Sequence, residues 1–165
     1  MKTITSNAKH TKTILREVKE SLSNEFTSNE FTVVIGGYEA SQESDFDYFV
    51  IHDRSFQDAK AVLDVVKKIS AKYVDKEPSI EGPFANPQDI EDVLHNIGGN
   101  KDTNYAITRR ILFLLESEFL YNESKSIEYK NRLLNVYAKG DLNNNQIILF
   151  KYASTGSIQL ATKKL

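Results

Sequence analysis

The sequence predicts an α/β (α+β) fold, in which a small mixed sheet is flanked by helices and followed by a helical C-terminal part. Two short apolar runs, at residues 31–35 and 46–52, have the length and the β-branched and aromatic content of buried strands. Longer segments repeat apolar residues at three- and four-residue spacing, which is typical of amphipathic helices. With 165 residues, the chain is long enough for one domain with an appended helical part.

Two helices are expected to pack on this sheet. The first covers residues 7–24, and the second covers residues 55–73 after the second strand. Ser55 is the expected N-cap of the second helix, with Asp58 three residues later in the capping-box position. The inward faces of the two helices are defined by regularly spaced apolar residues, which are Ile14, Leu15, Val18 and Leu22 in the first and Ala59, Val62, Leu63, Val66, Ile69 and Tyr73 in the second.

The middle of the chain is expected to be mostly irregular. Residues 76–87 hold all three prolines, which favours an extended or looped segment with at most a short edge strand near residues 79–84. A short helix should then run from residue 87 or 88 to residue 96. The pair Gly98-Gly99 is expected to end it.

The C-terminal part is expected to be helical. A long, well-buried helix over residues 103–121 should be capped by Asp102, and another helix should follow over residues 124–138. We therefore expect a core over residues 1–100, a helical extension over 101–140 and a tail over 141–165. The residues expected to face inward are Ile107, Ile111, Leu114, Leu115 and Phe119 in the long helix, and Ile127, Leu133, Leu134 and Tyr137 in the next.

Composition restricts the class of protein. The chain has no cysteine, which excludes disulfides and thiolate metal sites and fits a reducing cytoplasm. No apolar run has the length of a membrane span or of a signal-peptide core, so a cytoplasmic protein without a membrane partner is expected. The formal net charge is −2, so a nucleic-acid partner would need a local basic patch.

The most informative motif joins the two predicted strands. The first strand ends in Gly36-Gly37, and the second opens with Asp45 and Asp47. Because side chains alternate along a strand, the two aspartates should point the same way, and hard cations such as Mg²⁺ offset the repulsion of two aligned carboxylates. A glycine pair lets backbone amides approach a phosphate closely. These are the parts of a metal-assisted phosphoryl or nucleotidyl transfer site.

Simpler interpretations of the same residues stay open. The aspartates are also typical of a solvated strand start, and two glycines also form a plain tight turn. On the long helix, the guanidinium of Arg109 or Arg110 has the geometry to bind a phosphate, but an ion pair with a nearby glutamate explains either arginine as well.

The stretch Phe31–His52 resembles the signature of the nucleotidyltransferase superfamily, whose best-known member is DNA polymerase β. That signature is a strand, Gly-Gly or Gly-Ser, a short helical turn, and Asp-apolar-Asp on the next strand. A second block, Asn96–Thr103 followed by the Leu-rich segment Thr108–Ser117, is similar to a region of a poorly characterised bacterial branch of this superfamily. Together the two blocks span most of the chain, from Thr32 to Tyr137.

This resemblance implies a nucleotidyltransferase-like fold and a Mg²⁺-dependent activity. The expected reaction moves a nucleoside monophosphate, most plausibly AMP from ATP, to a hydroxyl of an acceptor that is a protein, a tRNA or a small molecule. Asp45 and Asp47 would hold the metal, and Gly36 and Gly37 would contact the phosphates. Further site residues are expected at Ser44 as a hydroxyl donor, Arg109 as a phosphate ligand, and Glu81, with Glu77 next, as the third catalytic carboxylate.

One departure from the superfamily pattern keeps a second hypothesis open. Seven residues separate Gly37 from Asp45 here, where related sequences usually have about ten. A residue spans ~3.3 Å, so a shorter loop displaces a bound triphosphate by several Å. The alternative is a catalytically degenerate relative that binds a nucleotide or a protein as a regulatory module. A small helical interaction domain is a third option, and an exposed apolar area on the helical part would favour a homo-oligomer.

Overall fold

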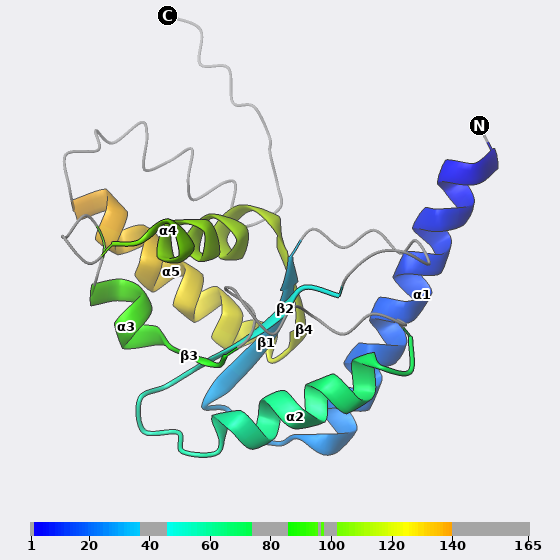
Figure 1. Cartoon of the computed structure of the whole chain (residues 1–165), viewed down its shortest axis with the longest axis horizontal. Coiled ribbons are helices and arrows are strands. Elements are labelled where there is room, and N and C mark those ends of the chain that lie inside the picture. The colour runs from blue at the N-terminus through cyan, green and yellow to red at the C-terminus, as the bar shows by residue number, and fades with distance from the viewer. Residues whose placement is uncertain (1, 37–45, 74–85, 96, 98–101, 140–165) are drawn as a thin grey trace, which may run out of the picture.

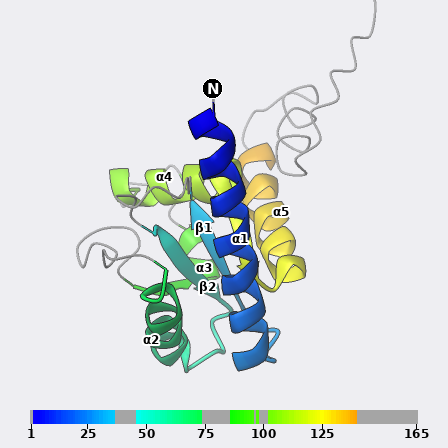
Figure 2. The same cartoon turned by 90° about the vertical axis from the view of Figure 1, so that its right-hand side faces the viewer.

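A four-stranded mixed sheet lies at the centre of the molecule, with helices on both faces (Figures 1 and 2). The computed structural model describes residues 2–36, 46–73, 86–95, 97 and 102–139. The α/β (α+β) fold with a small mixed sheet is confirmed. The segments expected to be extended near 79–84, to end a helix at Gly98-Gly99 and to form a tail over 141–165 lie outside the described residues.

The strand order is β3-β2-β1-β4, so β1 occupies a central position. Antiparallel pairing joins β1 to both β2 and β4, whereas β2 and β3 are parallel. Every residue of β1 is buried because helices cover the strand on both faces. The two predicted strands are therefore confirmed within one or two residues. The strands are β1 (Phe31–Gly36), β2 (Tyr48–His52), β3 (Gln88–Asp89) and β4 (Ser117–Tyr121).

Helices α1 (Lys2–Glu25) and α2 (Ala59–Ser70) cover one face of the sheet (Figure 2). The apolar stripe predicted for α1 is correct, since all four of its residues are buried against the strands. Alternation along β1 and β2 sends every second side chain into this layer. The strand residues buried here are Phe31, Val33 and Ile35 of β1, Tyr48 and Val50 of β2, and Leu120 and Tyr121 of β4, together with Phe46 just before β2.

The start of α2 differs from the prediction. The helix begins at Ala59, and Asp58 occupies the N-cap position without a capping hydrogen bond from its side chain. The Ser55 hydroxyl instead donates to Oε1 of Glu30 at 3.3 Å. The chain between β2 and α2 is thus a turn. Its serine bonds to the residue before β1 and does not cap the amides of the helix.

The opposite face carries α3 (Ile90–His95), α4 (Asn104–Ile111), the π-helix η1 (Leu112–Glu116) and α5 (Glu123–Lys139). The predicted short helix starts later than expected, because Gln88 and Asp89 first pair with the end of β2. A second core fills this layer between the sheet and the helices. Its buried members are Val34, Phe49, Ile51, Ile90, Phe113, Leu114, Tyr129, Leu133 and Leu134.

The single long helix predicted over residues 103–121 is wrong in its second half. After α4, the helix widens into η1, and Ser117–Tyr121 forms β4 against β1. The pairing satisfies the backbone of β1 along an edge that would otherwise be open, which outweighs the helical periodicity of the segment. The predicted inward face is correct in part, because Leu114 is buried and Phe119 packs against the second core, whereas Ile107, Ile111 and Leu115 are exposed.

The predicted burial of α5 is correct in part. Leu133 and Leu134 are buried as expected, and Tyr137 packs against the same core. Ile127, however, is exposed, and its place is taken by the fully buried Tyr129. This exchange turns a slightly different face of the helix towards the sheet. It brings a phenol, where an aliphatic side chain was expected, beside the end of β2.

Candidate functional site

Gly36 and Asp47 lie directly opposite each other where β1 ends and β2 begins. The register pairs Ile35 with Tyr48, and the amide of Gly36 donates to the carbonyl oxygen of Asp47 at 2.9 Å. The antiparallel arrangement therefore brings Gly36 and Asp47 together at one end of the sheet. Gly37, Ser44, Asp45 and Glu81 lie outside the described residues.

Asp47 directly precedes β2, and we expect its side chain to continue the alternation of that strand. Its neighbours Phe46 and Tyr48 are fully buried on the α1 and α2 face, so alternation places Asp47 on the other side. Gly36 faces the same way, since a Cβ there would point at Phe49 and Leu112. Asp47 is half-buried.

The geometry limits what Gly36 itself does. Its amide is engaged by the Asp47 carbonyl, so contacts of this turn with a phosphate depend on amides that follow residue 36. Its backbone conformation lies outside the left-handed region. A Cβ would come no closer than 3.8 Å to Phe49 and 4.0 Å to Leu112, which are ordinary contact distances. Neither strain nor crowding therefore requires glycine at this position.

Arg109 projects from α4 onto the sheet. Its guanidinium donates to Oε1 of Gln88 in β3, which is the strand next to β2. Burial lowers the pKa of Arg109 below its ordinary value, and an arginine side chain keeps its charge in proteins. The hydrogen bond to Gln88 orients a permanent cation on the β3 side of the sheet.

Arg110 has a structural role. It is only 2% exposed, and Nη2 lies 2.6 and 2.7 Å from the two carboxylate oxygens of Asp102. Nε donates to the hydroxyl of Tyr137 at 2.8 Å, which ties α4 to α5. Burial by itself would lower the pKa of Arg110, but the bonds to Asp102 and Tyr137 raise it. An arginine held in this way is not available to a phosphate.

The predicted role of Asp102 as a helix cap is wrong. The N-cap of α4 is Thr103, whose hydroxyl accepts a hydrogen bond from the amide of Ala106 at 3.2 Å. Threonine at this position satisfies one of the free amides of the first turn. The carboxylate of Asp102 is thereby left for the buried ion pair with Arg110.

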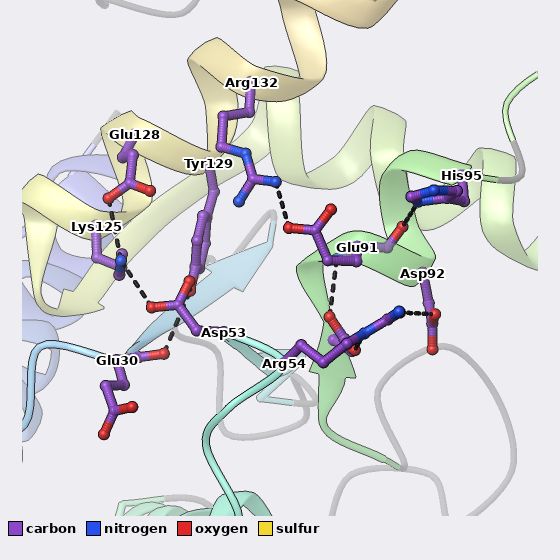
Figure 3. Close-up of polar contacts among 11 residues, drawn as sticks. Glu30, Asp53, Arg54, Glu91, Asp92, His95, Lys125, Glu128, Tyr129 and Arg132 are labelled. Atoms are coloured by element: carbon purple, nitrogen blue, oxygen red, sulfur yellow. Dashed lines mark hydrogen bonds and ion pairs between the residues drawn. The ribbon is translucent and has the colours of Figure 1, made fainter.

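A polar network at the other end of the sheet was not predicted from the sequence (Figure 3). Asp53 follows β2 directly, and its carboxylate accepts from the Tyr129 hydroxyl at 2.9 Å and from the Lys125 ammonium at 2.9 Å. Lys125 also contacts Glu128 at 3.1 Å. Burial, followed by the nearby carboxylate of Asp53, raises the pKa of Tyr129 well above its ordinary value. The phenol is therefore a permanent donor.

A second group of ion pairs in Figure 3 fixes α3. Arg54 bridges Asp89 and Asp92, and Glu91 pairs with Arg132 of α5. The amide of Glu91 also donates to Oδ1 of Asp89 at 2.8 Å. Each of these carboxylates faces a cation. The ion pairs therefore hold the end of β2, α3 and α5 together. An acidic residue directly after a strand was the only sequence signal for it.

The metal prediction rests on a single described residue. Within residues 2–36, 46–73, 86–95, 97 and 102–139, no three or more His, Cys, Asp or Glu side chains are arranged to hold a metal ion. Asp47 is the described member of the expected ligand set. A half-buried carboxylate on a strand end suits Mg²⁺, which is usually held by one or two carboxylates and keeps several waters.

Two further findings concern partners. Across the described ranges, none of the helices combines the length and the apolar character needed to cross a bilayer.

Three exposed apolar residues, Ile107, Ile111 and Leu115, follow one another at four-residue spacing along α4 and η1. Side chains at this spacing share one side of a helix, so they form an apolar stripe.

Comparisons with known proteins leave this site without a named relative. Neither a protein family, nor a curated protein, nor a solved structure matches the chain.

Proposed function

We propose that this chain is a Mg²⁺-dependent nucleotidyltransferase that transfers a nucleoside monophosphate to a hydroxyl of an acceptor and releases pyrophosphate. ATP is the preferred donor in this proposal, and the acceptor is a protein, a tRNA or a small molecule. One observation carries the proposal. Gly36 and Asp47 are cross-strand neighbours at one end of the sheet, where the amide of Gly36 donates to the carbonyl oxygen of Asp47.

The residues divide the chemistry between them. Asp47, with Asp45 of the same motif, would hold Mg²⁺, which neutralises phosphate charge and lowers the pKa of an attacking hydroxyl. The turn after Gly36 would supply backbone amides to the phosphates. Arg109 supports the proposal as a permanent cation that Gln88 orients on the same layer of helices. Glu81 is the candidate for the third carboxylate.

A second candidate function is a nucleotide- or protein-binding module that has lost catalysis. Two observations favour it, namely the seven-residue spacing between Gly37 and Asp45 and the engagement of the Gly36 amide by Asp47. Both reduce the number of amides that can surround a triphosphate. A misplacement of 1 Å already costs ~10²-fold in rate.

Mg-ATP titration followed by thermal unfolding tests the proposed site. A ligand at a hundredfold excess over its Kd stabilises the folded state by about 2.7 kcal/mol. We expect this stabilisation to need Mg²⁺ and to disappear in Asp47→Asn and in the double variant Asp45→Asn, Asp47→Asn. Asp64→Asn is the matched control, because Asp64 is an exposed carboxylate on α2.

Transfer of label from α-labelled ATP to a component of a cell lysate then separates the two candidates. Label transfer that Asp47→Asn abolishes supports the transferase. Metal-dependent stabilisation without any transfer supports the binding module. If millimolar Mg-ATP leaves the unfolding midpoint unchanged, the nucleotide site is refuted.

A further inference from the structure

Charge is distributed unevenly along the chain. Residues 1–16 contain four Lys or Arg and no Asp or Glu. The whole chain has 21 basic and 23 acidic side chains, so the other 149 residues carry 17 basic and 23 acidic ones and are acidic on balance. A basic segment attached to an acidic body is typical of a chain that contacts a polyanion.

The basic segment forms the N-terminal half of α1, which projects beyond the sheet (Figures 1 and 2). Along α1, the residues that pack in the core begin only at Ile14. Residues 9–13 belong to neither core. Lys9 and Lys12 are exposed here, and Arg16 is exposed one turn after Lys12. This half of the helix therefore presents its cations to solvent.

Lys9, Lys12 and Arg16 form a basic stripe along α1. They follow one another at three- and four-residue spacing, so they share one side of the helix, and roughly 10 Å of helix axis separates the first from the last. Among the described residues, neither Lys9 nor Lys12 has a carboxylate partner. Arg16 lies 3.9 Å from Glu20, but both side chains are more than 60% exposed, and such a pair is weak. All three cations are therefore available to an anion.

The surroundings of the basic stripe favour a nucleic acid over a membrane. A helix that lies on a membrane needs an apolar face to insert. The apolar face of α1 is already buried against the strands, and residues 9–13 offer no apolar side chain. Phosphates follow one another at about 3.4 Å along one strand of B-form DNA, so about three phosphate steps match the length of the stripe.

We propose that the basic stripe of α1 binds the phosphodiester backbone of a nucleic acid, with Lys9, Lys12 and Arg16 each neutralising one phosphate. DNA and RNA share this chemistry. Phosphate contacts position a nucleic acid without reading its bases, so the binding is independent of base sequence. The acidic remainder of the chain repels a polyanion and confines the contact to α1. The proposal does not rest on the proposed function, because these contacts need neither Mg²⁺ nor ATP.

The salt dependence of binding tests this proposal, measured by fluorescence anisotropy of a labelled DNA duplex of about 20 base pairs. Each neutralised phosphate contributes about −0.9 to the slope of log affinity against log salt, so three contacts predict a fall of about 40-fold between about 50 and 200 mM salt. Lys12→Ala removes one contact and should reduce this fall to about 12-fold. Lys60→Ala is the matched control, because Lys60 is an exposed lysine on α2, and it should leave the slope unchanged.

The other outcomes are distinct. No anisotropy change at low salt, or equal slopes for Lys12→Ala and the parent chain, would overturn the proposal. Binding to phosphatidylserine vesicles without binding to the duplex would overturn it in favour of a membrane surface. If circular dichroism shows that Lys12→Ala has lost helix, Lys9→Gln decides instead, because it removes a charge and keeps a long polar side chain. A single-stranded RNA of the same length identifies the partner, since tighter binding than that of the duplex assigns the stripe to RNA and weaker binding assigns it to DNA.

Discussion

The hydroxyl of Tyr129 lies 2.9 Å from Oδ1 of Asp53, which joins the middle of α5 to the residue after β2 (Figure 3). The phenol is completely buried, whereas the carboxylate is half-buried and also paired with Lys125. The contact connects residues 76 positions apart in the chain. Such a distant bond holds α5 in register on the sheet.

Removal of the Tyr129 hydroxyl should destabilise the fold. Tyr129→Phe keeps the ring and leaves a charged acceptor with one donor fewer, so we expect a loss of about 1–2 kcal/mol in the free energy of unfolding. Urea unfolding at neutral pH measures it. Tyr105→Phe is the matched control, since Tyr105 is 64% exposed and we expect no loss of stability there. Equal stability of both variants would show that the Asp53 contact contributes nothing.

The ion pair between Arg110 and Asp102 is expected to be the most sensitive one described. Arg110→Met leaves the Asp102 carboxylate, which is 11% exposed, without its cation. Removing one partner of a buried pair typically costs about 3–5 kcal/mol. The comparison is Arg16→Met, because Arg16 is 69% exposed and pairs with Glu20 at 3.9 Å within α1. An exposed pair contributes at most about 1 kcal/mol, so comparable losses in the two variants would contradict the assignment.

Stability should depend on the ionisation of Asp89. Burial alone would raise the pKa of this carboxyl, but the Arg54 side chain and the Glu91 amide lower it below its ordinary value of 3.8. A lowered folded-state pKa means that the ionised carboxylate stabilises the fold above pH 3.8. That contribution is lost as the pH falls through the folded-state value.

Asp89→Asn tests this pH dependence, because the amide oxygen still accepts from Glu91 while the charge is gone. We expect the variant to be less stable than the parent at pH 7, with the difference shrinking as the pH falls below 3.8. Urea unfolding across this range measures the difference. A gap that stays constant down to pH 3 would mean that Arg54 does not favour the ionised form.

Gly36→Ala should be tolerated. The added methyl group meets nothing closer than 3.8 Å, and the backbone at this position does not need a left-handed conformation. Alanine also restricts the unfolded chain, so we expect a gain of about 0.4–1 kcal/mol in the free energy of unfolding. Gly36→Leu should instead lose about 1–3 kcal/mol by overpacking against Phe49 and Leu112. Thermal unfolding of both variants measures this, and destabilisation by alanine would show that the strand end is more crowded.

The apolar stripe of Ile107, Ile111 and Leu115 should promote self-association. Ile111 is 46% exposed and lies at the middle of the stripe. We expect Ile111→Glu to lower the weight-average mass in sedimentation velocity at high concentration, because a charge is costly in an apolar interface. Ile127→Glu on α5 is the control, since Ile127 is equally apolar and exposed but lies on a different helix. A purely monomeric parent chain would refute this surface as an interface.

The parts of the fold that sequence reasoning predicted are those that local patterns determine. β1 and β2 are short apolar runs bounded by polar residues, and the stripe of α1 repeats at helical spacing, so each carries its own signal. The opposition of Gly36 and Asp47 also follows from local order, because two strands joined by a short connection pair antiparallel. Gly37, Ser44, Asp45 and Glu81 remain predictions.

The parts that it missed depend on contacts between distant segments. Ser117–Tyr121 has a helical pattern, but the unpaired side of β1 converts it to a strand. Arg110 gives no sign in the sequence that it meets Asp102 and Tyr137 rather than a ligand. Tyr129 is buried because Asp53 accepts a hydrogen bond from its hydroxyl. The spacing of apolar residues along α5 does not reveal this contact. Tertiary hydrogen bonds and ion pairs decided these cases.

The passage from α4 through η1 into β4 proceeds without any loop, since Ile111 is followed at once by Leu112 and Glu116 at once by Ser117. This continuous segment contains no loop that could absorb a movement of one of its elements. Any tilt of α4, for instance when a molecule settles against Arg109, would pull directly on the strand that borders Gly36. The π-helix η1 is the element that joins α4 to β4 in this segment. We therefore expect a ligand that shifts α4 to change the amide signals of β1 as well as those of β4.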